Sequence, residues 1–322
     1  FAMLRRVAAA SDRPMAITIL QRDNKPDEWR SICGWIAEAN RGGLPMMGQV
    51  LTRATGIVLG FEVSQSPFTG RPTYDVLAER PFAERLAALR DPAVRARILG
   101  ELAGGDAMRR RVGRWDRIFP LTDPPDYEPP PEASVAAMAA RAGRDPSEFG
   151  YDLLLEDDGR KLLYRPLSNY TAGDLGAVRD MLTHDATIVG LGDGGAHVGI
   201  ICDASAIGTM LTHWTRDRAR GPKLPLAWGV KRITSDSARA IGLRDRGVIA
   251  PGYKADINVI DYDRLSISKP VVRYDLPSGG RRLVQTAAGY EATIVAGVPV
   301  YREGEATGAR GALSRGCPTP PD

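Results

Sequence analysis

The feature that most constrains this sequence is a cluster of glycines that directly follows a short β-branched segment. Residues 186–189 read Ala-Thr-Ile-Val, and glycine then occupies positions 190, 192, 194 and 195, with Asp193 inside the cluster and His197 just after it. Branched side chains of this kind are typical of a strand that is buried on both faces. Glycines after such a strand allow a sharp turn and a close approach of the backbone to a ligand. The pattern predicts a functional loop at the carboxyl end of a parallel strand.

Asp193 is the leading catalytic candidate, because α/β sheets place their chemistry beyond the carboxyl ends of their strands. A purely structural role, such as capping the next helix, stays open. The glycines also have the spacing of a dinucleotide fingerprint. An acid inside that loop opposes a pyrophosphate, and no second strand ending in an acid follows. A nucleotide-binding oxidoreductase is therefore an alternative that rests on glycine spacing alone.

Composition excludes several classes of partner. The net charge of +4 is spread over 322 residues, so nothing calls for nucleic acid. No apolar run approaches the roughly 20 residues that a membrane-spanning helix needs, so no membrane contact is expected. The 3 cysteines form no CxxC pair, and their odd number fits a reducing, cytoplasmic location. We expect a cytoplasmic globular protein that acts on a small-molecule substrate.

The first part of the chain alternates strands with a helix. The pattern predicts strands over 14–21 and 46–51 and, between them, a helix that is capped by Asp27 and stops at 42–43. This order is typical of an α/β fold with a parallel sheet. Gln49 on the second strand and Arg53 just beyond it are candidate substrate-binding residues, together with His197. An arginine suits a substrate carboxylate, although surface roles for Arg53 and His197 stay open.

The remaining elements are predicted from local patterns. Residues 52–67 are expected to form a loop or lid, and 157–159 the turn of a hairpin. The remaining expected strands cover 114–119, 151–156, 161–165 and 255–260; the expected helices cover 82–103 with a new start at Asp91-Pro92, a segment after the cap Asp145, 174–182, a segment after the cap Asp203, and 226–241; and a second hairpin is expected over 293–301.

Two long segments resemble a known family. Residues 243–261, which include Asp245-Arg246-Gly247, Pro251-Gly252 and Ala255-Asp256, resemble the passage of amidohydrolase-superfamily chains from their barrel into a small β-sandwich. Residues 191–197, followed by 202–205 and 211–214, resemble the last barrel strand and helix of the N-acyl-D-amino-acid deacylases, or D-aminoacylases. The resemblance implies a partial (β/α)8 TIM-like barrel over residues 1–245 and a C-terminal β-sandwich segment over 246–322.

The same resemblance implies a hydrolase that cleaves the amide bond of N-acyl-D-amino acids or related amides. Its cofactor would be zinc, which activates a water molecule. Asp193 would both contact the metal and act as the general base, transferring the proton to the leaving nitrogen. The products would be a carboxylate and a D-amino acid.

The sequence departs from this family at the metal ligands. The His-x-His pair of the first barrel strand is absent, and the 3 histidines are His184, His197 and His213. The strands at 14–21 and 46–51 offer Gln21 and Gln49 where ligands are expected. We therefore expect this chain to be the C-terminal part of a longer protein that needs its missing N-terminal half, in cis or as another chain. A second copy of the chain, in a homo-oligomer, is a further expected partner. The alternative function is that of a metal-free family member that acts as a binding or assembly subunit.

Overall fold

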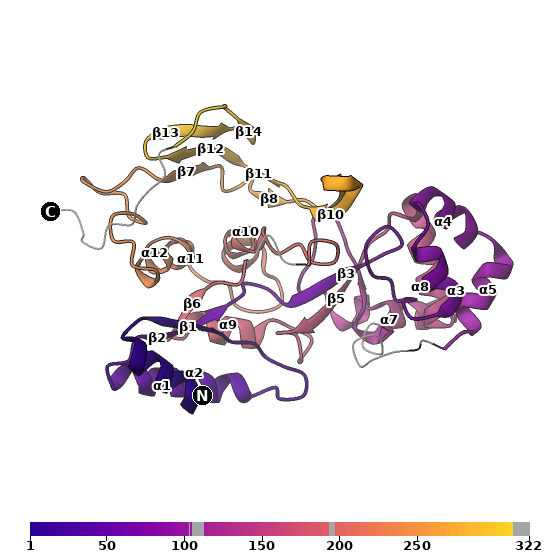
Figure 1. The fold of residues 1–322 in the computed structure, drawn as a ribbon, viewed down its shortest axis with the longest axis horizontal. Coiled ribbons are helices and arrows are strands. Elements are labelled where there is room, and N and C mark those ends of the chain that lie inside the picture. The colour runs from indigo at the N-terminus through magenta and orange to yellow at the C-terminus, as the bar shows by residue number, and fades with distance from the viewer. Residues whose placement is uncertain (103, 105–112, 193–196, 312–322) are drawn as a thin grey trace.

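The computed structural model describes residues 1–102, 104, 113–192 and 197–311. Figure 1 shows three parts: a parallel sheet with its helices at the lower left, a lobe with α3, α4, α5, α7 and α8 at the right, and a set of C-terminal strands along the top. No helix within these described ranges is both long and apolar enough to span a bilayer.

A parallel sheet of three strands forms the first part. Its order is β1-β2-β6, with β1 (Met15–Thr18), β2 (Met46–Val50) and β6 (Thr187–Val189) all parallel. Helix α2 (Glu28–Arg41) connects β1 to β2, and α1 (Ala2–Ser11) precedes them. The strands predicted over 14–21, 46–51 and 186–189 and the helix after Asp27 are thus confirmed, and so is the strand–helix–strand order.

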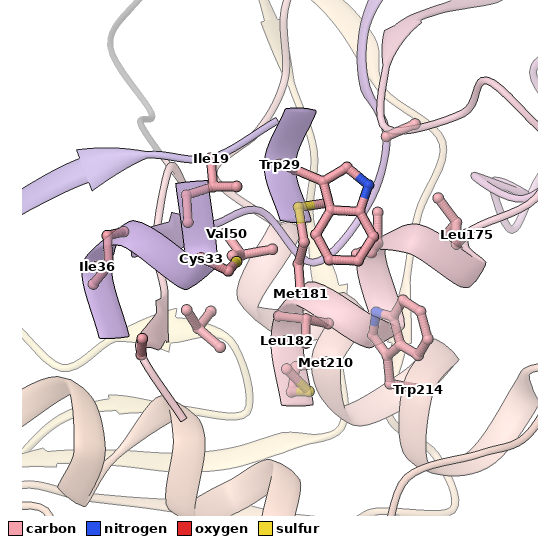
Figure 2. Packing of buried hydrophobic residues seen from close by; sticks show 14 of the residues in the cluster. Ile19, Trp29, Cys33, Ile36, Val50, Leu175, Met181, Leu182, Met210 and Trp214 are labelled. Carbon is pink, nitrogen blue, oxygen red and sulfur yellow. The ribbon is translucent and has the colours of Figure 1, made fainter. Parts of the chain in front are cut away.

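The core of this part lies between the sheet and its helices, as Figure 2 shows. Trp29, Cys33 and Ile36 project from one face of α2, because they recur at helical spacing. They meet Met181 of α9 (Gly176–Thr183) and Trp214 of the π-helix η3 (Met210–Asp217) in one buried cluster. Burial of these apolar side chains is the main force that holds the sheet and its helices together.

The packing between β1 and β2 leaves no room for a side chain at position 48. A Cβ atom added to Gly48 would lie 2.1 Å from Cδ1 of Ile19, which is fully buried. Glycine is therefore required at this position of β2, even though it weakens a strand in other settings.

A lobe is inserted between β2 and β6. Its antiparallel sheet has the order β3-β5-β4, with β3 (Thr55–Leu59), β4 (Phe119–Pro120) and β5 (Leu163–Ser168). Its helices are α3 (Pro72–Ala78), α4 (Phe82–Leu89), α5 (Pro92–Gly100), η1 (Trp115–Arg117), η2 (Pro131–Ala133), α7 (Val135–Arg141) and α8 (Pro146–Gly159). Phe61, Phe68 and Tyr151 form its aromatic core, in which the ring of Tyr151 lies 5.4 Å from Phe61 and 5.1 Å from Phe68.

Two predictions for this lobe are wrong. Residues 52–67 contain the strand β3 and not only a loop, because β3 pairs with β5 more than a hundred positions later in the chain. Residues 114–119 form mostly the short helix η1, and only Phe119 and Pro120 pair with β5. Both errors concern strands whose pairing partner is remote in sequence.

The hairpin predicted around residues 157–159 is also wrong. Asp145 accepts backbone N–H bonds from Ser147 and Glu148, and this cap starts α8, which continues through the expected strand 151–156. Asp157 and Asp158 have φ values of 52° and 53°, so they end the helix and do not turn a hairpin. The apolar run Tyr151 to Leu155 fits either structure, and packing of Tyr151 into the aromatic core selects the helix.

The chain after β6 returns to the sheet through short helices. These are α10 (Ala206–Thr209), η3, α11 (Leu226–Ile233) and α12 (Ser235–Ala240). The single helix predicted over 226–241 is wrong, because Thr234 breaks it with φ −120° and ψ −90°. Asp203 does not cap the next helix as expected, since its carboxylate is bound to Arg53.

The C-terminal strands form a four-stranded antiparallel sheet and two smaller pairs. The larger sheet has the order β14-β13-β12-β7. The bounds are β7 (Ile257–Ile260), β8 (Ser266–Ile267), β9 (Val271–Leu276), η4 (Pro277–Gly279), β10 (Gly280–Val284), β11 (Ala287–Ala288), β12 (Tyr290–Val295), β13 (Val298–Arg302) and β14 (Glu305–Ala306). The hairpin predicted over 293–301 is confirmed, with positive φ at both Ala296 and Gly297.

The α/β class is therefore confirmed. Neither β1 nor β6 pairs along its outer edge with another strand of the described residues. The (β/α)8 barrel, the β-sandwich and the division into residues 1–245 and 246–322 stay predictions.

A buried ionic centre ties the lobe to the helices of the sheet. Arg218 donates to both carboxylate oxygens of Glu128 at 3.0 Å, and the backbone N–H of Leu175, which starts α9, donates to it at 2.8 Å. His213 Nε2 lies 2.9 Å from the same carboxylate. Burial alone would raise the pKa of Glu128, but His213, Arg218 and the Leu175 N–H outweigh it and lower the pKa to about 2.

This centre makes the stability of the fold depend on acid pH. Because the pKa of Glu128 is lower in the folded state than its ordinary value of 4.5, its contribution is full above pH 4.5 and is lost as pH falls towards 2. We expect the free energy of unfolding to decrease by about 3 kcal/mol across this range through Glu128. Urea titrations from pH 5 to pH 2 measure it. Glu128→Gln should flatten the dependence, while the exposed control Glu132→Gln should keep it; equal slopes would contradict the assignment.

Candidate active site

The carboxyl ends of β1, β2 and β6 meet at one edge of the parallel sheet. The pairing continues past the strands, because Ile19 N–H donates to Gln49 O and Gly190 N–H donates to Val50 O, both at 3.0 Å. Gln21, Thr52 and Gly190 therefore leave the sheet side by side. In parallel α/β sheets this edge is where catalytic and binding residues gather.

Gln49 lies beside the start of the glycine cluster. It pairs in register with Ile188 of β6, and a Cβ atom added to Gly190 would lie 3.0 Å from its Cβ and 3.1 Å from its Oε1. The first glycine of the cluster is thus needed because the Gln49 side chain occupies the space above it. The structure brings Gln49 to the loop that carries Asp193, and its role as a substrate ligand stays a prediction.

Gln21 and Asn169 form a reciprocal pair at the same edge. Gln21 N–H donates to Asn169 Oδ1 at 2.7 Å, and Asn169 N–H donates to Gln21 O at 2.8 Å. Asn169 is fully buried with φ 64°, a left-handed conformation that asparagine tolerates well. The pair joins the end of β1 to the end of β5, and the side chain of Gln21 accepts the Thr171 N–H at its Oε1 at 3.2 Å, so Gln21 makes structural contacts here.

Arg53 is fully enclosed and holds the segment that follows the glycine cluster. Its guanidinium donates to the Asp203 carboxylate at 2.7 Å, to Ser205 Oγ at 3.3 Å and to the Cys202 carbonyl, and it stacks 4.0 Å above the ring of Tyr127. Burial alone would lower the pKa of Arg53, but Tyr127 and Asp203 outweigh it and raise the pKa. These contacts occupy the side chain that sequence reasoning assigned to a substrate carboxylate.

His197 lies at the start of a clamped turn. Its carbonyl accepts the N–H groups of Ile200 and Ile201 at 2.8 and 2.9 Å, and its side chain is exposed. The next residues are held from two sides: Ser64 N–H donates to Gly199 O at 3.1 Å, and Leu283 N–H of β10 donates to Val198 O at 2.8 Å. The lobe and the C-terminal strands therefore both fix the backbone that leaves the glycine cluster.

Asp193 lies outside the described residues, together with positions 194–196. Its role as general base and metal ligand stays a prediction. The dinucleotide alternative loses support, because its fingerprint needs a helix that opens on the glycines. Residues 197–205 form turns and irregular structure, and the next helix, α10, begins only at Ala206.

The residues described do not fit a zinc site. No group of three or more His, Cys, Asp or Glu side chains among them is placed to hold a metal ion. His184 precedes β6, at the end of the strand opposite the glycine cluster, and its Nδ1 accepts the Ala186 N–H. His213, on η3, lies against the carboxylate of Glu128. Since the three histidines occupy three separate places, a zinc ion would need ligands from beyond this part of the chain.

Sequence reasoning missed the partners that organise this edge. Tyr127, Asp203 and Gln285 surround Arg53, and Gln285 Nε2 donates to the Tyr127 hydroxyl at 3.0 Å while its Oε1 accepts from Ser205. These residues come from the lobe, the segment after β6 and the C-terminal strands. No local motif marks them, because they become neighbours only when the three parts assemble.

Comparison with known proteins adds the family. A family model described as "Amidohydrolase family" matches residues 1–301. No curated protein sequence matches. Among solved structures, two of D-aminoacylase are 18% and 19% identical with TM-scores of 0.46 and 0.47, and each alignment covers 95% of this chain and 50% of the other. N-acyl-D-glutamate deacylase from Bordetella bronchiseptica, solved with zinc and a phosphonate inhibitor, is 18% identical with a TM-score of 0.46, over 96% of this chain and 51% of the other.

The parallel sheet and its helices define an α/β protein. The family match extends over nearly the whole chain, and the chain belongs to the amidohydrolase family. It spans about half the length of the solved chains that it matches.

A substitution at position 53 separates a structural role from a ligand role. Arg53→Met should leave Asp203 buried without its partner and lower the free energy of unfolding by about 3–5 kcal/mol. Urea denaturation measures the effect, with the exposed ion-pair residue Arg90→Met as the control, for which a change below about 1 kcal/mol is expected. A variant that keeps wild-type stability and only raises KM for a substrate with a free carboxylate would make Arg53 a substrate ligand.

Proposed function

We propose that this chain contributes the catalytic loop of an amidohydrolase that cleaves the amide bond of N-acyl-D-amino acids or related amides. The observation that carries the proposal is the position of the glycine cluster. It begins at the carboxyl edge of β6 beside Gln49, and the backbone after it is anchored by Arg53, Ser64 and Leu283. Such anchoring suits a loop whose one carboxylate must be held in a fixed position against a substrate. The substrate class itself comes from the resemblance of residues 191–197 and 202–214 to the deacylases.

In this proposal Asp193 moves the proton. Its carboxylate takes a proton from the attacking water as the scissile carbonyl becomes tetrahedral, and then gives that proton to the leaving nitrogen. Gln49 borders the same loop and would orient the amide by hydrogen bonding. His197, whose side chain is exposed beyond the loop, would contact the substrate carboxylate. Arg53 would contribute to substrate binding indirectly, because it holds residues 202–205 in place.

Zinc enters this proposal only from outside the described residues. The resemblance implies a zinc-dependent reaction, but these residues do not supply a ligand set, so no step is assigned to the metal. The ligands would come from an N-terminal half, in cis or as another chain. The free outer edges of β1 and β6 support this, because parallel strands are rarely left unpaired and exposed in water.

The alternative of a metal-free binding or assembly subunit is less favoured. The family match runs through residues 1–301, and it includes the glycine cluster with its acid. Retention of a carboxylate at position 193 is what an active hydrolase needs. A cytoplasmic location, homo-oligomer formation and the particular acyl group stay parts of the proposal without support of their own.

Removal of the Asp193 carboxylate should abolish turnover. In a protein that joins this chain to an N-terminal half, Asp193→Asn should lower kcat for N-acetyl-D-amino acids by at least about 100-fold, since a general base contributes this much. KM should change little. Hydrolysis of paired D and L substrates is measured, with the exposed Asp180→Asn as the control. Equal turnover by Asp193→Asn and wild type would remove the catalytic assignment.

Completion of the sheet should change assembly state and metal content. The 322-residue chain alone should self-associate and bind less than about one zinc per chain, because its sheet edges are unpaired and its ligand set is incomplete. Light scattering and elemental analysis of the short and extended chains measure both properties. A short chain that is monomeric, melts cooperatively and holds stoichiometric zinc would refute the need for a further half.

A further inference from the structure

A polar cavity lies where the lobe meets the C-terminal strands. It has a volume of about 310 Å³ and lies among α3, α4, the turn after β3, and β10. Arg85 of α4 and Arg281 of β10 both line it, together with the hydroxyl-bearing residues Ser64, Thr69 and Tyr74. The cavity therefore brings two cations and several hydrogen-bond donors to one small space.

Arg85 is buried without an acidic partner. Only 2% of the residue is exposed, and its guanidinium donates to two backbone carbonyls, Phe61 O at 2.5 Å and Arg80 O at 3.0 Å. Its Nε has no hydrogen-bond partner among the residues that the structure describes. Buried charges in proteins are almost always paired, because an unpaired buried charge is costly. A bound anion would therefore stabilise the buried charge of Arg85.

Arg281 adds a second positive charge to the cavity. It faces the same cavity as Arg85, and no carboxylate in the described ranges lies within 4.0 Å of either guanidinium. Burial lowers the pKa of Arg85, Tyr74 raises it, the positive charge of Arg281 lowers it, and Tyr274 and Glu79 raise it by less, so that the pKa is lowered overall. Two like charges at one cavity repel each other unless a negative charge lies between them.

The two acids at the cavity do not fill this role. Asp75 Oδ1 accepts the Gly70 N–H at 2.8 Å, so it is used in closing the turn before α3. Glu79 follows the end of α3 and is exposed to solvent. Neither carboxylate pairs with Arg85 or Arg281.

We propose that this cavity binds a small oxyanion, a phosphate or a carboxylate, between Arg85 and Arg281. Guanidinium groups bind both kinds of oxyanion through paired N–H donors, and hydroxyl groups complete the shell. Binding would link α4 of the lobe to β10. It would also reach Ser64, whose N–H holds Gly199 O in the segment after the glycine cluster. The proposal does not depend on amide hydrolysis.

The test is calorimetric titration of the intact protein with inorganic phosphate and, separately, with acetate, at constant ionic strength. One anion per chain is expected to bind. Arg281→Gln should weaken binding by about tenfold or more, because it removes a charged hydrogen-bond donor. Arg282→Gln, next in sequence but exposed and paired with Asp275, should bind as wild type does. Binding of phosphate alone identifies a phosphate site, and binding of acetate alone a carboxylate site.

Thermal melting separates this site from a structural use of Arg281. Without added anion, Arg281→Gln should melt at the wild-type temperature or higher, because it removes repulsion of Arg85. Phosphate or acetate should raise the melting temperature of wild type and of Arg282→Gln, but not of Arg281→Gln. The proposal is overturned if neither anion binds to wild type, if both variants lose binding equally, or if Arg281→Gln melts at a lower temperature.

Discussion

The enclosure of the Arg53 guanidinium is the interaction on which the rest of the site depends. A fully buried cation must be surrounded by acceptors, and those of Arg53 come from Cys202, Asp203 and Ser205. The face of Tyr127 covers the guanidinium, and Gln285 holds both Tyr127 and Ser205. Satisfying one charge therefore draws together the end of β2, the segment after β6, the lobe and the C-terminal strands. Residues 202–205, which follow the glycine cluster in the chain, are held by this assembly.

A second constraint is the parallel sheet of three strands, β1-β2-β6. Three strands with two free edges bury their apolar side chains against α2, α9 and η3, but they leave main-chain groups without strand partners among the described residues. Parallel strands are stable mainly where both faces and both edges are covered. The three histidines lie in three separate places, and no metal-ligand set forms among the residues that the structure describes. The chain spans about half the length of the solved chains that it matches.

A third feature is the lobe inserted into the parallel sheet. It enters the chain between two neighbouring parallel strands, and it has its own aromatic core around Phe61, Phe68 and Tyr151. It reaches the glycine loop at Ser64 and the helices of the sheet at Glu128. Arg85 and Arg281 line the polar cavity where this lobe meets β10. The lobe therefore contacts the segment after the glycine cluster, the helices of the sheet and β10.

The sequence by itself determined the parallel strands, the helix between the first two, the hairpin at Ala296-Gly297 and the membership of the amidohydrolase family. The strands, the helix and the hairpin depend on periodicity, caps and turn residues that lie close together in the chain, so local physics is enough to predict them. The family came from the resemblance of residues 191–214 and 243–261. The sequence also placed Gln49 on the second strand, and the structure brings that strand beside the glycine cluster. Only the tertiary structure decided that Arg53 is held by Asp203 and Tyr127, that residues 55–59 form a strand, and that residues 151–156 are helical. Each of these depends on partners far away in sequence, and the free energy that selects them arises only when those partners meet.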